Sequence, residues 1–220
     1  MQQLPRRRGF LIRLTAGAVA LAGGVGTRAA AQLPSRASVP DQDRWLDLLT
    51  AEFRQVFDLV TPAGHIGLAF ARNLLNASAE GYGLTDRDTN IVVSFRHSAT
   101  PYAFGNAVWE GYDLGKVYEI DDPATGQRAV RNPVLGAESD TASRMSASMH
   151  ALAARGVIFT VCGMAYRRLV GEAARRSGRD LETVRAEWEK ALFPGAFVAP
   201  AGVVAVNRAQ KHGCAYTYAG

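Results

Sequence analysis

The fold class is decided by an apolar run that ends in a thiol, Gly156-Val157-Ile158-Phe159-Thr160-Val161-Cys162-Gly163. β-Branched and aromatic side chains fill its centre, and its length suits a strand buried on both faces of a sheet. Residues 90–95 (NIVVSF) repeat the pattern. A helical stretch, residues 164–176, follows the thiol directly. A strand that passes straight into a helix is typical of a parallel α/β sheet.

The same alternation of strand and helix continues on both sides of this stretch. Further strands are expected at residues 56–60, 196–198 and 214–218, and further helices at 41–53, 65–79, 107–112, 141–154, 180–192 and 202–211. The pattern predicts an α/β fold, with a mainly parallel five-stranded sheet covered by helices on both faces and joined by right-handed crossovers. Residues 113–141 show no convincing periodicity, so we expect a loop insertion at the surface.

The first 31 residues are typical of a twin-arginine export leader. Arg7-Arg8-Gly9-Phe10-Leu11 matches the R-R-x-F-L core, a weakly apolar segment spans residues 14–25, and Ala29-Ala30-Ala31 is an A-x-A cleavage site. The alternative is an uncleaved membrane anchor, but the apolar segment is short and Arg13 lies at its edge, whereas a spanning helix needs about 20 apolar residues. We therefore predict a signal peptide (1–31), export in the folded state and a periplasmic location.

The leader also accounts for the positive charge of the chain. The whole sequence has 25 basic and 20 acidic residues, a net charge of +5. Five of the arginines, and none of the acidic residues, belong to the leader, so the remaining chain is balanced at 20 of each. A balanced surface has no long-range attraction for nucleic acid or anionic lipid. We expect a flexible connector (32–40), one domain (41–220), no nucleic-acid partner and no stable membrane insertion after cleavage.

Three reactive side chains follow successive predicted strands. His65 comes after the first strand, His97 after the second, and Cys162 ends the third. Because the carboxyl ends of parallel strands meet at one edge of a sheet, all three are expected at the same edge, where ligands of such sheets bind. The helix after Cys162 is expected to favour its thiolate, which is the nucleophilic form. The alternative is that Cys162 is a small buried hydrophobic residue.

Three further positions are candidates for ligand binding. Arg96, beside His97, either neutralises an anionic sulfur ligand or pairs with an acidic neighbour. Gly64 lies at a strand-to-helix turn, where backbone amides can hold an anion, and Gly163 follows Cys162. Nucleotide-binding glycine motifs are absent from the sequence, and the histidines and cysteines lack the local spacing of metal ligands. No cofactor and no metal are expected.

A disulfide between the two cysteines is not expected, although an exported protein with an even number of cysteines invites one. Cys214 opens the last predicted strand, whereas Cys162 ends its own, so the two lie at opposite edges of the sheet. A six-residue strand spans roughly 20 Å, and a disulfide needs Cα atoms within about 7 Å. Cys214 is expected to pack beside Tyr216 and Tyr218.

The C-terminal third resembles the DsrE-like family of sulfur-relay proteins. The resemblance rests on residues 156–164 (the strand with its cysteine), on FPGAFVAPAGV at 193–203, which fits PG-x-x-x-x-P-x-G-V, and on QKHGCAY at 210–216, which fits Q-x-x-G-x-x-Y. It is specific over residues 145–220, looser over 54–112 and absent from 113–141. It implies a flavodoxin-like three-layer α/β/α domain that forms homo-oligomers, with a persulfide carried on Cys162.

These observations give two expectations for function. The first is an exported DsrE-like protein that binds or relays sulfane sulfur through Cys162, with His97 and His65 shaping the pocket. Its partners would be a sulfur donor or acceptor protein, or a small thiol. The second is a non-catalytic, oligomeric periplasmic binding protein whose insertion, 113–141, recognises a small ligand or a protein partner. The leader is a departure from the classical members of the family, which work in the cytoplasm.

Overall fold

The computed structural model describes residues 41–139 and 144–220, so the predicted leader and connector lie outside the described residues. Within these residues the chain forms the strands β1 (Phe53–Leu59), β2 (Thr89–Phe95), β3 (Ile158–Cys162), β4 (Phe197–Ala199) and β5 (Ala215–Tyr218). The helical segments are η1 (Asp41–Leu48), η2 (Pro62–Gly64), α1 (His65–Tyr82), η3 (Asp86–Asp88), η4 (His97–Ala103), α2 (Asn106–Tyr112), α3 (Leu114–Val117), α4 (Met149–Ala154), α5 (Gly163–Ser177), α6 (Leu181–Lys190) and α7 (Gly202–Lys211).

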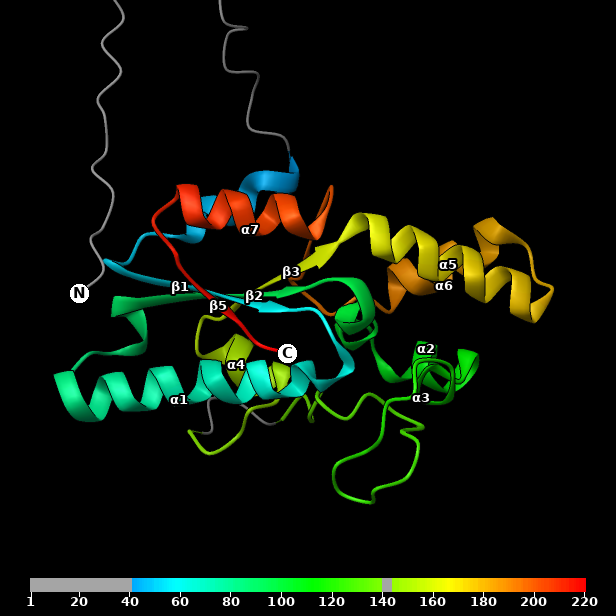
Figure 1. Cartoon of the computed structure of the whole chain (residues 1–220), viewed down its shortest axis with the longest axis horizontal. Coiled ribbons are helices and arrows are strands. Elements are labelled where there is room, and N and C mark those ends of the chain that lie inside the picture. The colour runs from blue at the N-terminus through cyan, green and yellow to red at the C-terminus, as the bar shows by residue number, and fades with distance from the viewer. Residues whose placement is uncertain (1–40, 140–143) are drawn as a thin grey trace, which may run out of the picture. The chain divides into compact units, whose positions relative to one another are not determined.

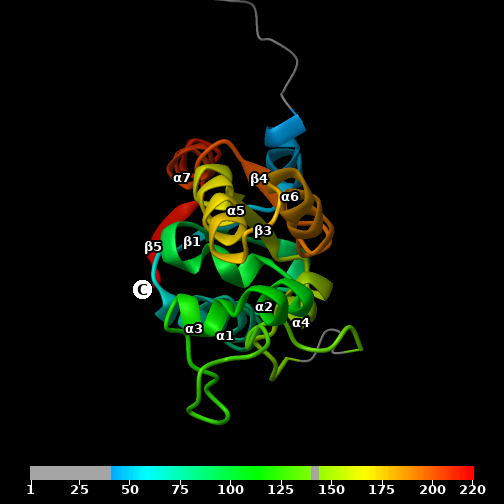
Figure 2. The ribbon, with the colours of Figure 1, turned by 90° about the vertical axis from the view of Figure 1, so that its right-hand side faces the viewer.

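The five strands form one parallel sheet in the order β4-β3-β2-β1-β5. Figure 1 shows the sheet from the side, and Figure 2 shows β4 and β5 at its two edges. Helices cover both faces, which confirms the predicted three-layer α/β/α fold. The central strands are buried on both faces because their side chains point alternately to the two helix layers. Phe57 and Val93 belong to the core on the α1 side, whereas Val56 and Val92 belong to the core on the α7 side.

The strand order explains which helices lie on which face. From β1 to β4 the chain moves across the sheet in one direction, so right-handed crossovers place α1 and the helices from α2 to α6 on the same face. From β4 to β5 it returns over the whole sheet, and α7 therefore lies on the opposite face, beside η1 (Figures 1 and 2). The crossover that leaves β4 thus runs in the opposite direction to the one that leaves its neighbour β3.

Several predicted elements are confirmed with close boundaries. α7 spans residues 202–211, as predicted, and each of the five predicted strands is present within a few residues of its expected position. Asp180 caps α6, because its carboxylate accepts a hydrogen bond from the Thr183 amide at 2.9 Å.

Two predicted helices are shorter in the structure. The first was expected over 41–53, but η1 ends at Leu48 and Phe53 already pairs with Thr89 in the sheet. The Ala51 amide donates a hydrogen bond to the Asn90 side chain at 2.7 Å. This bond fixes residues 49–52, which connect η1 to β1, in a non-helical conformation. The helix expected over 141–154 begins only at Met149, where Ser148 accepts the capping bond from Ala151.

Residues 113–139, the described part of the predicted surface insertion, are mostly exposed, but some of their side chains reach the core. The side chains of Leu114, Ile120, Ala129 and Val134 are buried in the core. The Ala129 amide bonds to the Ile120 carbonyl at 2.9 Å. Asn132 is buried and donates to the carbonyls of Tyr102 and Phe104 at 2.7 and 2.8 Å. Leu114 belongs to the short helix α3, whereas the later parts of the segment are fixed to the domain by irregular contacts.

Candidate functional site

Cys162 lies where two helices diverge from the carboxyl edge of the sheet. It is the last residue of β3, and the chain enters α5 directly after it, whereas the neighbouring strand β4 leads into α7 on the opposite face. In open α/β sheets such a reversal leaves a crevice at the strand ends, and ligands bind there. The described structure thus places the predicted cysteine at the position that this topology favours for a site.

The Cys162 side chain also caps α5. Its Sγ accepts a hydrogen bond from the Ala165 amide at 3.4 Å, and the residue is 8% exposed. The N-terminal turn of a helix carries partial positive charge and spare amide donors, both of which stabilise a negative sulfur. The predicted placement of Cys162 at a helix N-terminus is therefore confirmed.

Gly202, the first residue of α7, lies against both Cys162 and Arg96. A Cβ atom at Gly202 would lie 2.5 Å from Cβ of Arg96 and 3.2 Å from Cβ of Cys162. Real Cβ atoms do not come this close to other carbons, so the contact requires glycine. The side chains of Arg96 and Cys162, from the ends of two adjacent strands, therefore both lie against Gly202.

Gly163 is required by a similar close approach. A Cβ there would lie 2.6 Å from the backbone oxygen of Ala199, at the end of β4. This contact accounts for a glycine at residue 163 without a ligand. It also shows how tightly the β3–α5 and β4–α7 junctions meet.

Replacing Gly163 by alanine is expected to lower the free energy of unfolding by roughly 1–3 kcal/mol, because two backbone segments must move apart. Gly171, in the same helix, is the matched control. A Cβ there meets only a flexible arginine side-chain nitrogen at 3.5 Å, so Gly171→Ala should cost nothing or stabilise the protein by about 0.5–1 kcal/mol. Urea denaturation of both variants measures the difference, and equal stabilities would contradict the close approach.

Arg96 is held by a buried carboxylate that the sequence analysis did not identify. Asp58, on β1, accepts the Arg96 Nε–H at 2.6 Å and an Nη2–H at 2.8 Å. The Tyr216 hydroxyl, on β5, donates to the same carboxylate at 2.9 Å. Of the two roles considered for Arg96, the ion pair with an acidic neighbour is thus present.

The network has clear electrostatic consequences. The Asp58 side chain is 2% exposed and that of Arg96 is 25% exposed. The hydrogen bond to Asp58 raises the pKa of Arg96, and the nearby Cys162 contributes in the same direction. Burial, followed by the bond to Asp58, raises the pKa of Tyr216. Asp58 thus fixes the orientation of a permanently charged guanidinium in the neighbourhood of Cys162.

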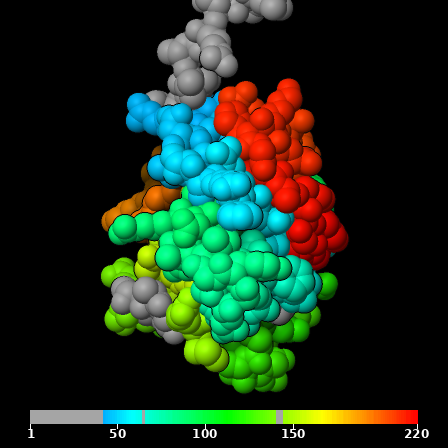
Figure 3. All heavy atoms as spheres, turned by 90° about the vertical axis from the view of Figure 1, so that its left-hand side faces the viewer, coloured from blue at the N-terminus to red at the C-terminus, as the bar shows by residue number. Residues whose placement is uncertain are grey.

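The ion pair forms one wall of a pocket of about 390 Å³ on the α7 side of the sheet. Its lining residues come from β1, the end of β2, α7 and β5: Asp58, Arg96, Val203, Val206, Asn207, Gln210 and Tyr216. A larger cavity of about 590 Å³ lies at the opposite, amino edge, the side of the molecule seen in Figure 3. Its lining includes the apolar side chains Phe53, Leu74 and Leu84, and neither cysteine contributes to it.

The two predicted histidines and Gly64 border the same edge but have different roles. His97 begins η4 with φ at 51°, and its exposed ring bonds through Nδ1 to Ser98 Oγ at 2.8 Å rather than to Cys162. His65 begins α1, and Gly64 ends the short η2 before it. The His65 side chain lies outside the described residues, so the structure does not test its predicted contact with the site.

Cys162 and Cys214 are both free and buried. Cys214 belongs to the core formed by η1 and α7. Burial raises the pKa of its thiol to about 11, so it stays protonated at neutral pH. The cysteines are unpaired, as expected, and Cys214 is a packing residue. Its neighbours differ from those predicted, because Tyr216 and Tyr218 are exposed and do not belong to this core.

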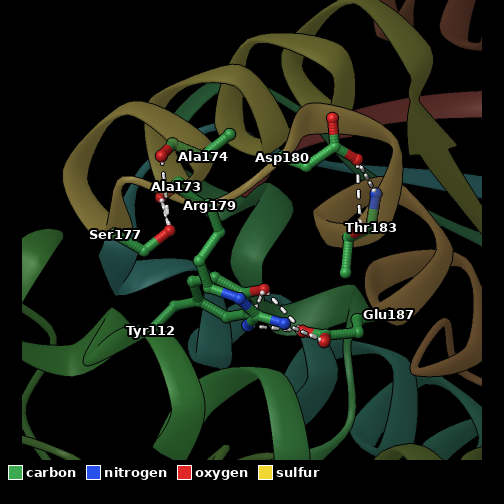
Figure 4. Close-up of polar contacts among 8 residues, drawn as sticks. All are labelled: Tyr112, Ala173, Ala174, Ser177, Arg179, Asp180, Thr183 and Glu187. Carbon is green, nitrogen blue, oxygen red and sulfur yellow. Dashed lines mark hydrogen bonds and ion pairs between the residues drawn. The ribbon is translucent and has the colours of Figure 1, made fainter.

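A second polar cluster, shown in Figure 4, joins α2 to the turn between α5 and α6. Tyr112 donates to the Glu187 carboxylate at 2.6 Å, and Arg179 bonds to both of them at 3.0 Å. Burial, followed by the Glu187 bond, raises the pKa of Tyr112 to about 12, and the bond from Arg179 lowers the pKa of Glu187. Every member is paired with another, so this cluster serves to connect helices.

Within residues 41–139 and 144–220 no group of three or more histidine, cysteine, aspartate or glutamate side chains is arranged to hold a metal ion. Among the described helices, none has the length and apolar character needed to cross a bilayer.

Comparison with known proteins gives little further information. Neither the known protein families nor the curated proteins include a match to the chain. A solved structure that is similar to it is that of a protein of unknown function, MTH1491 from Methanobacterium thermoautotrophicum. The two are 17% identical with a TM-score of 0.37, over 76% of this chain and 99% of that chain. A likeness of this size carries no information about activity.

Proposed function

We propose that this chain is an exported DsrE-like protein that accepts sulfane sulfur on Cys162 and passes it to an acceptor thiol. The observation that carries the proposal is the placement of Cys162 at the diverging ends of β3 and β4. Its sulfur accepts a hydrogen bond from the Ala165 amide in the first turn of α5, and Arg96 lies beside it against Gly202. An amide donor and a nearby cation are groups that can bind the sulfur during such a reaction.

The transfer step is an exchange at sulfur. The Cys162 thiolate attacks the terminal sulfur of a donor persulfide, R–S–S–H. A new S–S bond forms at Cys162 as the S–S bond of the donor breaks. The terminal sulfur keeps its proton, and the donor leaves as the thiolate R–S⁻. The α5 amides stabilise the thiolate before the attack, and discharge to an acceptor thiolate is the same exchange in reverse.

The other parts of the proposal concern the surroundings of Cys162. His97 and His65 begin the segments that follow β2 and β1, so both are placed to border the approach to the carboxyl edge. The Arg7-Arg8 leader with its Ala29-Ala30-Ala31 site supports export and a periplasmic location. Assembly into a homo-oligomer follows from the family resemblance alone.

Incubation of the exported protein with glutathione persulfide tests this function. Intact-mass spectrometry should show cleavage after Ala31 and the gain of one sulfur atom. Cys162→Ser should abolish the gain, whereas Cys214→Ser, the matched control, should load as the natural chain does. Undiminished loading of Cys162→Ser would overturn the proposal, and an uncleaved leader would overturn its periplasmic part.

The rates of alkylation of the two cysteines separate the proposal from the binding-protein alternative. At about pH 8 Cys162 should react with iodoacetamide faster than Cys214 in the folded protein, because the nucleophile is the thiolate and the raised pKa of Cys214, about 11, keeps that thiol protonated. Peptide mapping measures both rates. A Cys162 that reacts no faster than Cys214 would favour a non-catalytic binding protein instead.

A further inference from the structure

The pocket beside the ion pair combines hydrogen-bond donors with an apolar wall. Arg96 contributes a guanidinium, and Asn207 and Gln210 contribute primary amides one turn apart on α7. Val203 and Val206 lie on the same face of that helix. Side chains of this kind suit a small ligand with one charged end and a short aliphatic part.

The charge of Asp58 does not determine what the pocket attracts. Its carboxylate is buried and already accepts three hydrogen bonds, two from Arg96 and one from Tyr216. A guanidinium has five N–H donors in a fixed fork, so the Nη1 group of Arg96 is outside this ion pair. Arg96 is also the more exposed partner, with 25% of its side chain accessible against 2% for Asp58. An anion that enters the pocket therefore contacts the exposed N–H groups of Arg96 rather than the buried carboxylate of Asp58.

The pocket is adjacent to the proposed reacting sulfur. Arg96 lines the pocket, and its side chain and that of Cys162 both lie against Gly202. A ligand anchored at Arg96 is therefore bound next to the residue that contacts the cysteine.

We propose that this pocket binds the carboxylate end of a small organic thiol or its persulfide, with the aliphatic part against Val203 and Val206. The carboxylate accepts hydrogen bonds from Arg96, Asn207 and Gln210, and the sulfur end extends past Gly202 toward Cys162. The inference rests on the proposed function, because it assigns the bound thiol the role of sulfur donor or acceptor. An inorganic sulfur oxyanion has no aliphatic part to contact Val203 and Val206.

Calorimetric titration with 3-mercaptopropionate tests the pocket, with Cys162→Ser as the host protein so that no sulfur exchange takes place. We expect saturable binding. The uncharged analogue 3-mercaptopropanol should bind at least about tenfold more weakly, because a charge-assisted hydrogen bond is lost. Thiosulfate should also bind more weakly. A preference for thiosulfate over the carboxylate would overturn the assignment to an organic thiol.

Three variants in the same host locate the site. Arg96→Gln should weaken binding by about tenfold or more, and the double variant Asn207→Ala with Gln210→Ala should weaken it without touching the buried ion pair. Lys211→Gln is the matched control, because it removes one positive charge from α7 outside the pocket and should leave binding unchanged. Unchanged binding in the double variant would overturn the proposal even if Arg96→Gln failed to fold.

The same materials distinguish the two proposals. If the natural chain fails to load sulfur but the host still binds 3-mercaptopropionate with the expected variant pattern, the sulfur-transfer function is wrong and the carboxylate pocket stands. If Cys162 loads sulfur while the host does not bind the ligand, the pocket assignment is wrong and the sulfur-transfer function stands.

Discussion

Replacing Arg96 by methionine is expected to lower the free energy of unfolding by about 3–5 kcal/mol, because a buried carboxylate loses its countercharge. Asp58 is almost entirely inaccessible to water, and without Arg96 only the Tyr216 hydroxyl would remain of its three hydrogen bonds. Methionine keeps much of the aliphatic stem that Gly202 contacts, so the measured loss reports mainly the electrostatic change. Chemical denaturation of the two proteins gives this difference directly.

Replacing the other partner, Asp58, should lower the free energy of unfolding by less. In Asp58→Asn the guanidinium of Arg96 loses its partner, but a quarter of its side chain is exposed and can be hydrated. We expect a loss of roughly 1–2 kcal/mol, the usual cost of a disrupted hydrogen-bonded pair. The double variant should cost less than the sum of the single ones, because each single variant already removes the interaction.

The difference in stability loss between Arg96→Met and Asp58→Asn distinguishes a buried network from an exposed ion pair. If Arg96→Met cost no more than Asp58→Asn, the carboxylate would have to be reachable by water, contrary to its position beneath α7. A loss below about 1 kcal/mol for Arg96→Met would place the pair among surface ion pairs. Arg96→Lys should recover part of the stability, since lysine keeps the charge but not the two-bond fork.

The sheet and most of its helices were predictable because their signals are local. Apolar runs bounded by turn residues predict the strands, and the spacing of apolar residues from 202 to 211 predicts α7. The placement of Cys162 at the carboxyl edge followed from the strand-to-helix junction in the sequence. Cys214 was likewise correctly placed as an unpaired core thiol.

The partner of Arg96 could not be predicted, because it depends on strand order. Asp58 is an acidic residue inside the apolar run VFDLV, which is a signal that was available. However, its contacts with Arg96 and Tyr216 exist only because β1 lies between β2 and β5. Local patterns do not encode that order. The pocket wall on α7 also depends on the strand order, because the crossover from β4 to β5 places α7 on the face of the sheet that carries Asp58.

Residues 113–141 show a different limit of sequence patterns. Their apolar residues Ile120, Ala129 and Val134 reach the core without helical or strand spacing, so periodicity analysis assigns them to the surface. Hydrogen bonds from the Asn132 side chain and between single backbone groups hold them in place. Such contacts join residues that are distant in sequence and produce no repeating signal.

Gly115→Ala is therefore expected to destabilise the protein by about 3 kcal/mol or more, at the upper end of the cost of overpacking. A Cβ at Gly115 would lie 1.9 Å from the backbone oxygen of Ala129 and 2.8 Å from its carbonyl carbon. No rotamer change relieves a clash with backbone, so the chain around Ala129 must leave its place. The bond between the Ala129 amide and the Ile120 carbonyl, and the burial of both side chains, would be lost with it.

Gly111→Ala, one turn earlier in α2, is the matched control for this substitution. Nothing lies within 4 Å of a Cβ at Gly111, so alanine should be neutral or stabilise the helix by about 0.5–1 kcal/mol. Urea denaturation and hydrogen exchange of the Ala129 amide provide the measurements. If Gly115→Ala were as stable as Gly111→Ala, residues 113–141 would be a loosely attached insertion after all. A partner-recognising role for that segment would then be favoured over its role in the core.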